Sequence, residues 1–409
     1  MSVSAFGRVA VLGIARGAAS GFGLLAVVLI ARALPPDQLG RWSLALAVQG
    51  YALHLGEFGL RSAVTTEAGR AGRRLPELLA RYFRLRLLMS ALAVALIVAG
   101  CAAWRPADLQ LVTLAGLSIL PIALQLDWLA LVDGRIWLAS GLLVVRPLIF
   151  LLLVALWPDE PAAEEIAVCF LVAWMVAAAS SWFALRRPVA DLCGTLCGVS
   201  RMLRRGACLA GVTIGNQLQL SADLLVVGWA LGATAAGDYW LASQVLVAGL
   251  LFANAAGQLA LARLPGLADD PARFGSAVLR EGVGILAVAL AGAAMALLAA
   301  PALPPLLGAE HAGVAAILPW LLPWFVLQHP TTVLQAALTA CGGEKAVLRA
   351  NLLGGAALLL ALGAALMVGS LPAFALARCA AEIVRLAVLI LALPSAARWL
   401  PRPQTSISA

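Results

Sequence analysis

Charged residues are scarce in this chain: only 12% of its 409 residues are Asp, Glu, Lys or Arg, while 63% are hydrophobic. Its three histidines are scattered, and it contains no glycine-rich phosphate loop, no G-x-S-x-G turn and no metal-ligand spacing. These absences argue against ATP hydrolysis, serine-hydrolase chemistry and a metal centre. We therefore expect neither an enzyme nor a bound cofactor, and the composition is typical of helical membrane proteins.

Lysine is almost absent, and the cysteines are poorly placed for chemistry. Of the 28 basic residues only Lys345 is a lysine. The seven cysteines form no disulfide framework, and Cys193, Cys197 and Cys208 match zinc spacings poorly. We interpret them as small hydrophobic side chains and unpaired thiols. The net charge of +8 fits basic loops at a membrane better than a nucleic-acid partner, so we expect no nucleic acid.

Long apolar runs, by contrast, are abundant. An α-helix rises about 1.5 Å per residue, so about 20 residues cross a hydrocarbon layer of roughly 30 Å. We expect an all-α polytopic membrane protein, and the first run is long enough to be a retained helix rather than a cleaved signal peptide. Pro319, Pro323 and Pro330 are expected to interrupt the tenth helix. The pattern predicts about twelve transmembrane helices, over residues 9–31, 41–64, 85–104, 109–132, 137–157, 165–185, 206–231, 238–262, 279–303, 314–340, 349–369 and 372–394.

Arginine falls almost wholly on one alternate set of the predicted loops. If the amino terminus lies in the cytoplasm, 20 basic residues fall in inner segments and only Arg32, Arg41 and Arg105 in outer ones. Because translocation of short loops disfavours positive charge, this bias predicts that both termini are cytoplasmic. The acidic cluster of residues 159–165 then lies outside. Residues 72–88 (GRRLPELLARYFRLRLL) form either an ordinary inner loop or a helix lying flat among the lipid headgroups.

A short repeat relates the two halves of the chain. At an offset of 197 residues, Gly40 corresponds to Gly237 and the aromatic Trp42 to Tyr239, with matching Ala-Leu and Leu-Ala pairs on either side. Six helices in each half give a parallel repeat, with its axis along the membrane normal. We therefore predict two pseudo-symmetric lobes, at residues 1–190 and 206–409, joined by a cytoplasmic linker at 191–205. Two such lobes can expose a central cavity to each side in turn.

Polar residues inside the spans mark cavities or buried partners, because a charge at mid-bilayer costs about 2.5–3.5 kcal/mol. Arg16 and Arg146 have no opposite charge at helical spacing in their own spans, so each needs a partner on another helix or a ligand. An arginine fork suits phosphate. Asn216, Gln217 and Gln219 place three amides within four residues, suited either to sugar hydroxyls or to hydrogen bonds between helices.

The acidic residues inside the spans have two interpretations. Glu57, Asp127 and Asp223 could carry a proton or bind Na⁺ to couple transport, or they could be the counter-charges of the arginines. Arg378 and Glu382 are four residues apart and share a helix face, so they can neutralise one another or take part in coupling. A coupling H⁺ or Na⁺ is the only ion that the sequence suggests.

Several short motifs resemble one family of membrane proteins. Residues 30–45 (IARALPPDQLGRWSLA) resemble the "aR-L-g-x-x-x-f-G-x-y-x-l-a" stretch of bacterial polysaccharide-repeat flippases. Further similarity lies at residues 56–60 (GEFGL), 126–130 (LDWLA), 133–135 (DGR), 216–228 and 236–239 (AGDY). These flippases belong to the multidrug, oligosaccharidyl-lipid and polysaccharide exporter (MOP) superfamily.

The resemblance implies alternating access in the bacterial inner membrane. It implies a cargo of undecaprenyl-pyrophosphate-linked oligosaccharide, moved from the cytoplasmic to the periplasmic leaflet for O-antigen or exopolysaccharide synthesis. The cavity in this family is often cationic, which would suit Arg16 and Arg146. Membrane lipids, a polysaccharide polymerase and glycosyltransferases are the partners implied.

Two other functions stay open at this stage. A multidrug or cation antiporter of the same superfamily would carry a smaller cargo, although arginines in the spans disfavour cations. A membrane-embedded glycan polymerase or ligase would need a sizeable outer loop with catalytic residues, and the sequence has no such loop.

Overall fold

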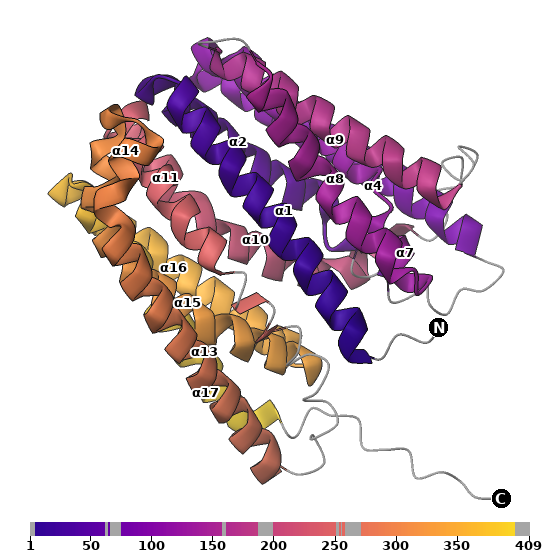
Figure 1. Cartoon of the computed structure of the whole chain (residues 1–409). Coiled ribbons are helices and arrows are strands. Elements are labelled where there is room, and N and C mark those ends of the chain that lie inside the picture. Colours follow the sequence, from indigo (N-terminus) through magenta and orange to yellow (C-terminus); the bar gives the residue numbers. More distant parts are fainter. Residues whose placement is uncertain are drawn as a thin grey trace, which may run out of the picture. The chain divides into compact units, whose positions relative to one another are not determined.

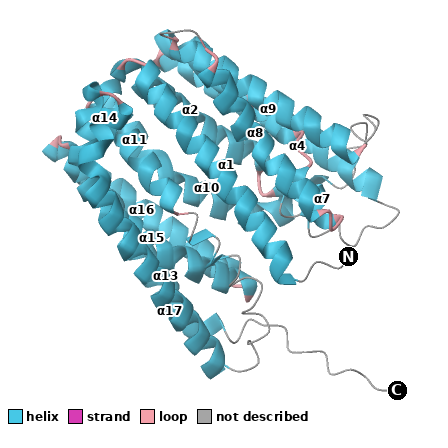
Figure 2. Cartoon of the chain, in the orientation of Figure 1, coloured by secondary structure: helices cyan, strands magenta, loops and turns pink. Residues whose placement is uncertain are grey.

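The computed structural model describes residues 5–61, 64–65, 75–157, 161–186, 199–250, 253–254, 256–257 and 271–396. Within these ranges every regular element is a helix (Figures 1 and 2). The elements up to residue 249 are α1 (Ala5–Ala33), α2 (Pro36–Glu57), α4 (Leu75–Trp104), η2 (Pro106–Asp108), α5 (Leu109–Leu117), α6 (Ile119–Ala123), α7 (Asp127–Val132), α8 (Ile136–Ala155), α9 (Ala163–Leu185), α10 (Val199–Ala230) and α11 (Ala233–Gly249). They are followed by α13 (Pro271–Ala299), η5 (Ala300–Ala302), α14 (Leu303–Leu307), η6 (Ala309–His311), α15 (Ala312–Ala340), α16 (Glu344–Val368) and α17 (Leu371–Ala396).

The predicted all-α, polytopic class is confirmed. Eight helical segments of the described chain are long and apolar enough to cross a membrane. The long helices α2, α10, α11 and α17 fall outside that set, and they match four of the other predicted spans. These four carry most of the polar side chains that the sequence singled out inside the bilayer.

The chain divides into two compact units. The first comprises residues 1–248 with 300–317, and the second residues 249–299 with 318–409. In the first unit α1 lies beside α8, α8 beside α9, and α2 beside α4 and α10 (Figure 1). In the second unit α16 packs along α17. The predicted lobes at 1–190 and 206–409 stay a prediction, and the predicted linker at 191–205 lies largely outside the described residues.

The predicted fourth helix, 109–132, is wrong in one respect: it is broken into α5, α6 and α7. The backbone groups released at the break find partners on α9. The Leu126 N–H donates to the Ser181 hydroxyl at 3.2 Å, and the Trp182 indole N–H donates to the Leu124 carbonyl at 2.8 Å. Because lipid offers no hydrogen bonds, non-helical backbone at membrane depth is tolerated only where protein satisfies it.

Two other expectations about helix ends are also corrected. The segment 75–88 does not turn before the third span, since α4 runs unbroken from Leu75 to Trp104. The three prolines of α15 lie inside one helix rather than interrupting it. Membrane helices tolerate proline because neighbouring groups can take up the freed carbonyls. The tight connection after α16 has Gly369 in the left-handed region at φ 66°, where glycine meets no Cβ penalty.

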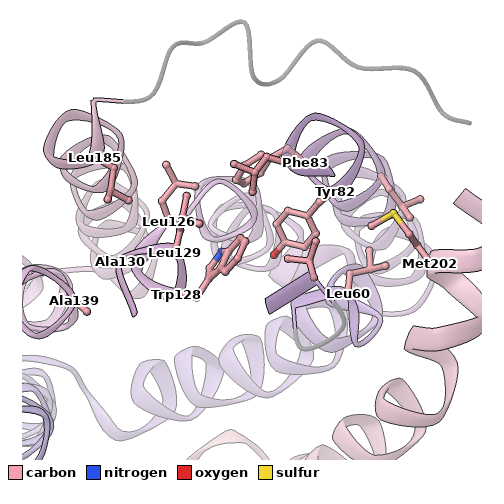
Figure 3. Packing of buried hydrophobic residues seen from close by; sticks show 13 residues of the cluster. Leu60, Tyr82, Phe83, Leu126, Trp128, Leu129, Ala130, Ala139, Leu185 and Met202 are labelled. Atoms are coloured by element: carbon pink, nitrogen blue, oxygen red, sulfur yellow. The ribbon is translucent and has the colours of Figure 1, made fainter. Parts of the chain in front are cut away.

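A core of buried side chains packs α7 and the residues that follow α2, among them Leu60, against α4 (Figure 3). Tyr82 and Trp128 meet edge to face, with ring centroids 5.5 Å apart. Arg86, which the sequence assigns to an inner loop, is instead buried in α4, where it donates to the Tyr82 hydroxyl at 2.5 Å. The core therefore includes a cation that only a tyrosine hydroxyl and ring accommodate among the described residues.

Candidate functional site

A cavity of about 370 Å³ lies in the first unit. Helices α1, α2, α8, α9 and α11 supply its walls. On the α1 side the wall is built of small residues, including Ala19, Ser20 and Gly23. Arg146 from α8 and Gln244 from α11 supply its long polar side chains. The cavity thus combines a narrow set of polar groups with a largely apolar wall, the usual make-up of a ligand site.

Arg146 is the charged group of this cavity. Its guanidinium lies over the ring of Trp174, with the central carbon 4.7 Å from the ring centroid. Among the described residues no carboxylate pairs with it. A desolvated cation–π contact of this kind contributes about 2 kcal/mol, but it leaves the N–H donors of the fork free of acceptors. The arrangement can hold an anion inside the membrane without a protein counter-charge to displace.

Part of the cavity wall is aromatic. Phe170 is the centre of this surface: its ring centroid lies 5.6 Å from Trp42, 5.4 Å from Phe150 and 6.2 Å from Trp174, all edge to face. Trp240 of α11 also lines the cavity. Edge-to-face packing holds the rings in fixed orientations, and the rings of Trp42, Phe150 and Phe170 are almost completely buried. A flat ring or the apolar face of a sugar fits such a wall.

Arg16 is not among the residues that line the cavity. It is half-buried on α1, three and four residues before Ala19 and Ser20, so it continues the same helix face by one turn. It has no hydrogen bond or ion pair within the described part of the chain. Its role at the site stays a prediction.

The amides of α10 do not line this cavity either. Gln217 donates to the Ser221 hydroxyl of its own helix at 2.6 Å and lies against Gly50 of α2. Gln219 is buried and Asn216 is half-buried. At Gln217, the structure matches the interpretation as contacts between and along helices more closely than direct contact with a ligand.

The three acids that the sequence suggests for coupling in the first unit have different surroundings. Asp127, the first residue of α7, accepts an ion pair from Arg61 at 2.8 Å. Asp223 is fully buried and accepts from the Tyr239 hydroxyl at 2.6 Å and from the Leu224 backbone N–H at 2.9 Å. Glu57 is half-buried at the last turn of α2. The structure therefore pairs Asp127 with Arg61, and not with Arg16 or Arg146, among the described residues.

The charges of α17 form their own buried network in the second unit. Arg378 lies over the Trp324 ring of α15, at 3.6 Å from the centroid. Glu382 lies 3.5 Å from Arg385, which also donates to Gln335 at 2.6 Å. All three charged side chains are almost completely buried. Trp324 and Gln335 extend the charged face of α17 onto α15, a contact that the spacing along α17 alone does not show.

Several residues of the site were not singled out from the sequence. The aromatic wall was missed because aromatic residues in apolar spans look like ordinary core. The partners of Arg41 were missed as well: it donates to Asp108 at 2.7 Å and to Glu164 at 3.0 Å, and so ties α2 to η2 and α9. Both acids lie within predicted outer segments, which is the signal that could have paired them with a rare outer arginine. The described residues contain no group of three His, Cys, Asp or Glu that could hold a metal ion.

No family model and no curated protein matches the chain. Solved structures do share its fold. An inward-facing multidrug resistance MATE family transporter of the MOP superfamily is 15% identical, with a TM-score of 0.73 over 93% of this chain and 96% of that one. The lipid II flippase MurJ, in an inward closed conformation, is 12% identical, with a TM-score of 0.74 over 94% of this chain and 87% of MurJ.

A third similar structure is a MOP superfamily transporter from Pyrococcus furiosus, described as having a binding pocket of reversed polarity that suggests a different function. It is 14% identical, with a TM-score of 0.65 over 95% of this chain and 96% of that one. At such identities the likeness concerns the fold alone. The chain is thus a multi-pass, all-α membrane protein with the fold of MOP superfamily transporters.

Proposed function

We propose that this protein is a transporter that moves an anionic, lipid-linked oligosaccharide between the leaflets of a bacterial inner membrane by alternating access. The cargo class is an undecaprenyl-pyrophosphate-linked oligosaccharide for surface polysaccharide synthesis. The observation that carries the proposal is Arg146: a guanidinium inside a membrane cavity, held by a tryptophan ring and free of any carboxylate among the described residues. A pyrophosphate is the counter-charge that would complete it.

The rest of the cavity supports the same cargo. Trp42, Phe150, Phe170 and Trp240 line the cavity, and the apolar face of a sugar would pack against this lining. The volume of about 370 Å³ is near the lower end for ligand cavities, so this cavity would hold the pyrophosphate end of the cargo, whereas the polyprenyl tail would stay in the surrounding lipid. The similar fold of MurJ, named as a lipid II flippase, supports a lipid-linked sugar over a free solute. The arginine bias supports cytoplasmic termini.

The test is a leaflet assay in proteoliposomes. Arg146→Gln is expected to lower the flipping rate of an undecaprenyl-pyrophosphate-linked sugar by about 10- to 100-fold, because a hydrogen bond to a charged group contributes about 1.5–3 kcal/mol. Arg146→Lys should retain part of the rate, since it keeps the charge but loses the fork. The matched control is Arg135→Gln, an exposed arginine next to the start of the same helix.

Equal flipping by Arg146→Gln and Arg135→Gln would contradict the proposal. A phosphate-free polyprenyl glycoside serves as the second substrate. Its rate should not depend on Arg146 if the guanidinium recognises pyrophosphate. If Arg146→Gln abolishes flipping of both lipids, Arg146 stabilises the protein and does not recognise the pyrophosphate.

The aromatic wall favours one alternative, a drug antiporter of the same superfamily. Four large rings around one cavity also suit flat hydrophobic molecules. Efflux of a planar cationic dye by the same proteoliposomes, unaffected by the lipid-linked sugar, would support this alternative. Arg146 disfavours it, because a cationic cargo would meet like charge in the cavity.

A further inference from the structure

Three chain segments far apart in sequence meet at one buried histidine. His311, the last residue of η6, has no exposed surface. Its Nε2 atom lies 3.0 Å from the carbonyl oxygen of Ala31, near the end of α1. Its Nδ1 atom lies 3.3 Å from a carboxylate oxygen of Asp238, in the second turn of α11. One imidazole therefore connects the end of α1, the beginning of α11 and η6. We call this group of residues the outer junction.

The two contacts of His311 demand a particular proton count. A backbone carbonyl can only accept a hydrogen bond, and so can an ionised carboxylate. Both ring nitrogens must therefore donate, which makes the bridging ring an imidazolium. A neutral imidazole carries one donor and one acceptor, and could satisfy only one of these neighbours. The closed outer junction thus holds one proton more than a neutral histidine beside an ionised aspartate.

The surroundings of His311 contain few other charges. Glu310 is its neighbour on η6, and Arg32 of α1 lines the same hollow as Glu310. Helix α15 brings Gly313 close to Asp238, where a Cβ would overlap the carboxylate, and its first turns carry no ionisable side chain. The short helix α14 (LPPLL) has no ionisable side chain. Asp238, Glu310, Arg32 and the imidazolium are therefore the charged groups that these contacts and this hollow bring together.

Close to the outer junction, two glycines at corresponding positions of the predicted repeat are in contact. Gly40 and Gly237, which correspond at the offset of 197, meet: a Cβ on Gly237 would lie 3.2 Å from the Gly40 nitrogen. A Cβ on Gly40 would overlap the carbonyl of Ala233. The beginning of α2 and the beginning of α11 are therefore in backbone contact, one residue away from Asp238. Only residues without a side chain permit this approach.

We propose that His311 is a proton-binding latch, whose protonation holds the outer junction closed and whose deprotonation accompanies its opening. This rests on the proposed alternating access, in which the predicted outer side must open at one stage of the cycle. When α1 and α11 separate, the imidazole loses both acceptors and meets water, where histidine changes charge between pH 5 and 8. Closing then takes up a proton and opening releases one. The latch differs from the acids that the sequence suggests for coupling, because none of these joins three segments at a predicted outer turn.

The test measures access to the cavity from each side of the membrane as a function of pH. A single reporter cysteine replaces Ser20, which lines the cavity, in a protein whose native cysteines are replaced. An impermeant maleimide is applied at pH values from 5.5 to 8.5. It reaches the outer side of the inner membrane in cells with a permeabilised outer membrane, and the inner side in inverted vesicles. Outside labelling is normalised to a cysteine at exposed Ala107, in a predicted outer segment, and inside labelling to a cysteine at exposed Asp133, in a predicted inner one, which corrects for the reactivity of the thiol itself. A latch that releases one proton shifts the opening equilibrium by up to about tenfold per pH unit.

We expect outside labelling of the wild-type protein to rise with pH and inside labelling to fall. His311→Gln should show no such dependence, since its amide can still donate to Ala31 but does not titrate. Asp238→Asn should also flatten the profile. His54→Gln, a half-buried histidine on α2, is the matched control and should keep the wild-type profile.

A pH profile that is flat in the wild-type protein, or unchanged in His311→Gln, would overturn the latch. So would an equal loss of pH dependence in His54→Gln. If His311→Gln fails to fold, the wild-type profile and Asp238→Asn decide the question. Labelling uses no cargo, so the two proposals can fail separately. A flat pH profile with normal sugar flipping would overturn the latch and leave the proposed function intact. A pH profile as expected without sugar flipping would overturn the proposed cargo and leave the latch intact.

Discussion

The ion pair between Arg61 and Asp127 allows a quantitative prediction. The two side chains approach to 2.8 Å, and the Asp127 side chain is 8% exposed while Arg61 is 35% exposed. Asp127→Asn keeps the shape and removes the charge. A fully buried pair that loses one partner costs about 3–5 kcal/mol, and an exposed pair about 0–1 kcal/mol. Because Arg61 can extend its side chain towards water, we expect a loss near the middle, about 2 kcal/mol in the free energy of unfolding.

The assay is equilibrium unfolding in mixed micelles, combined with a double-mutant cycle. Arg61→Gln is the second variant, and the coupling energy of the pair should be about 1–2 kcal/mol, the range found for residues in direct contact. Asp133→Asn is the matched control, an exposed aspartate directly after the same helix. A coupling energy below about 0.5 kcal/mol would refute the reasoning, since that is the size expected of independent sites.

The same variant separates two roles for Asp127. If the carboxylate only balances Arg61, Asp127→Asn lowers stability and leaves the pH dependence of transport unchanged. If it carries a coupling ion, transport loses its dependence on that ion while the coupling energy to Arg61 stays small. Measuring both quantities on one preparation distinguishes the alternatives that the sequence left open.

Two further predictions concern buried polar groups. Ser181→Ala should destabilise the protein by about 1–2 kcal/mol, because it leaves a backbone N–H at the break between α6 and α7 without an acceptor; Ser180→Ala, on the exposed side of α9, should change the melting temperature little. Glu382→Gln should cost about 3–5 kcal/mol, since it leaves the buried Arg385 with less counter-charge. Equal melting temperatures for Glu382→Gln and wild type would mean that Gln335 alone satisfies Arg385.

The helices and their membrane environment were predictable from local sequence. Runs of about twenty apolar residues predicted the spans, and the predicted helices 349–369 and 372–394 overlap α16 and α17 closely. The break in the fourth span was not predictable in the same way. It depends on Ser181 and Trp182, more than fifty residues away, whose hydrogen bonds make an interrupted helix tolerable in lipid.

The candidate site was predictable only in part. Arg146 stood out because a lone charge in a span requires a partner. Its contact with Trp174 and the aromatic wall around Phe170 were not visible, since rings in apolar spans carry no signal of what they face. The contacts of His311 were not predictable either, because its partners Ala31 and Asp238 lie 280 and 73 residues away in the sequence.

The sequence by itself determined that this chain is helical, that it lies in a membrane, and which charges require an explanation. These properties follow from the hydrophobicity and charge of about twenty neighbouring residues, and they do not depend on tertiary contacts. Only the tertiary structure decided which polar groups meet, as in the pairing of Arg61 with Asp127 and the bridging of Ala31 and Asp238 by His311. Such pairs form where helices distant in sequence pack together, because a buried polar group must find its partner across the interface.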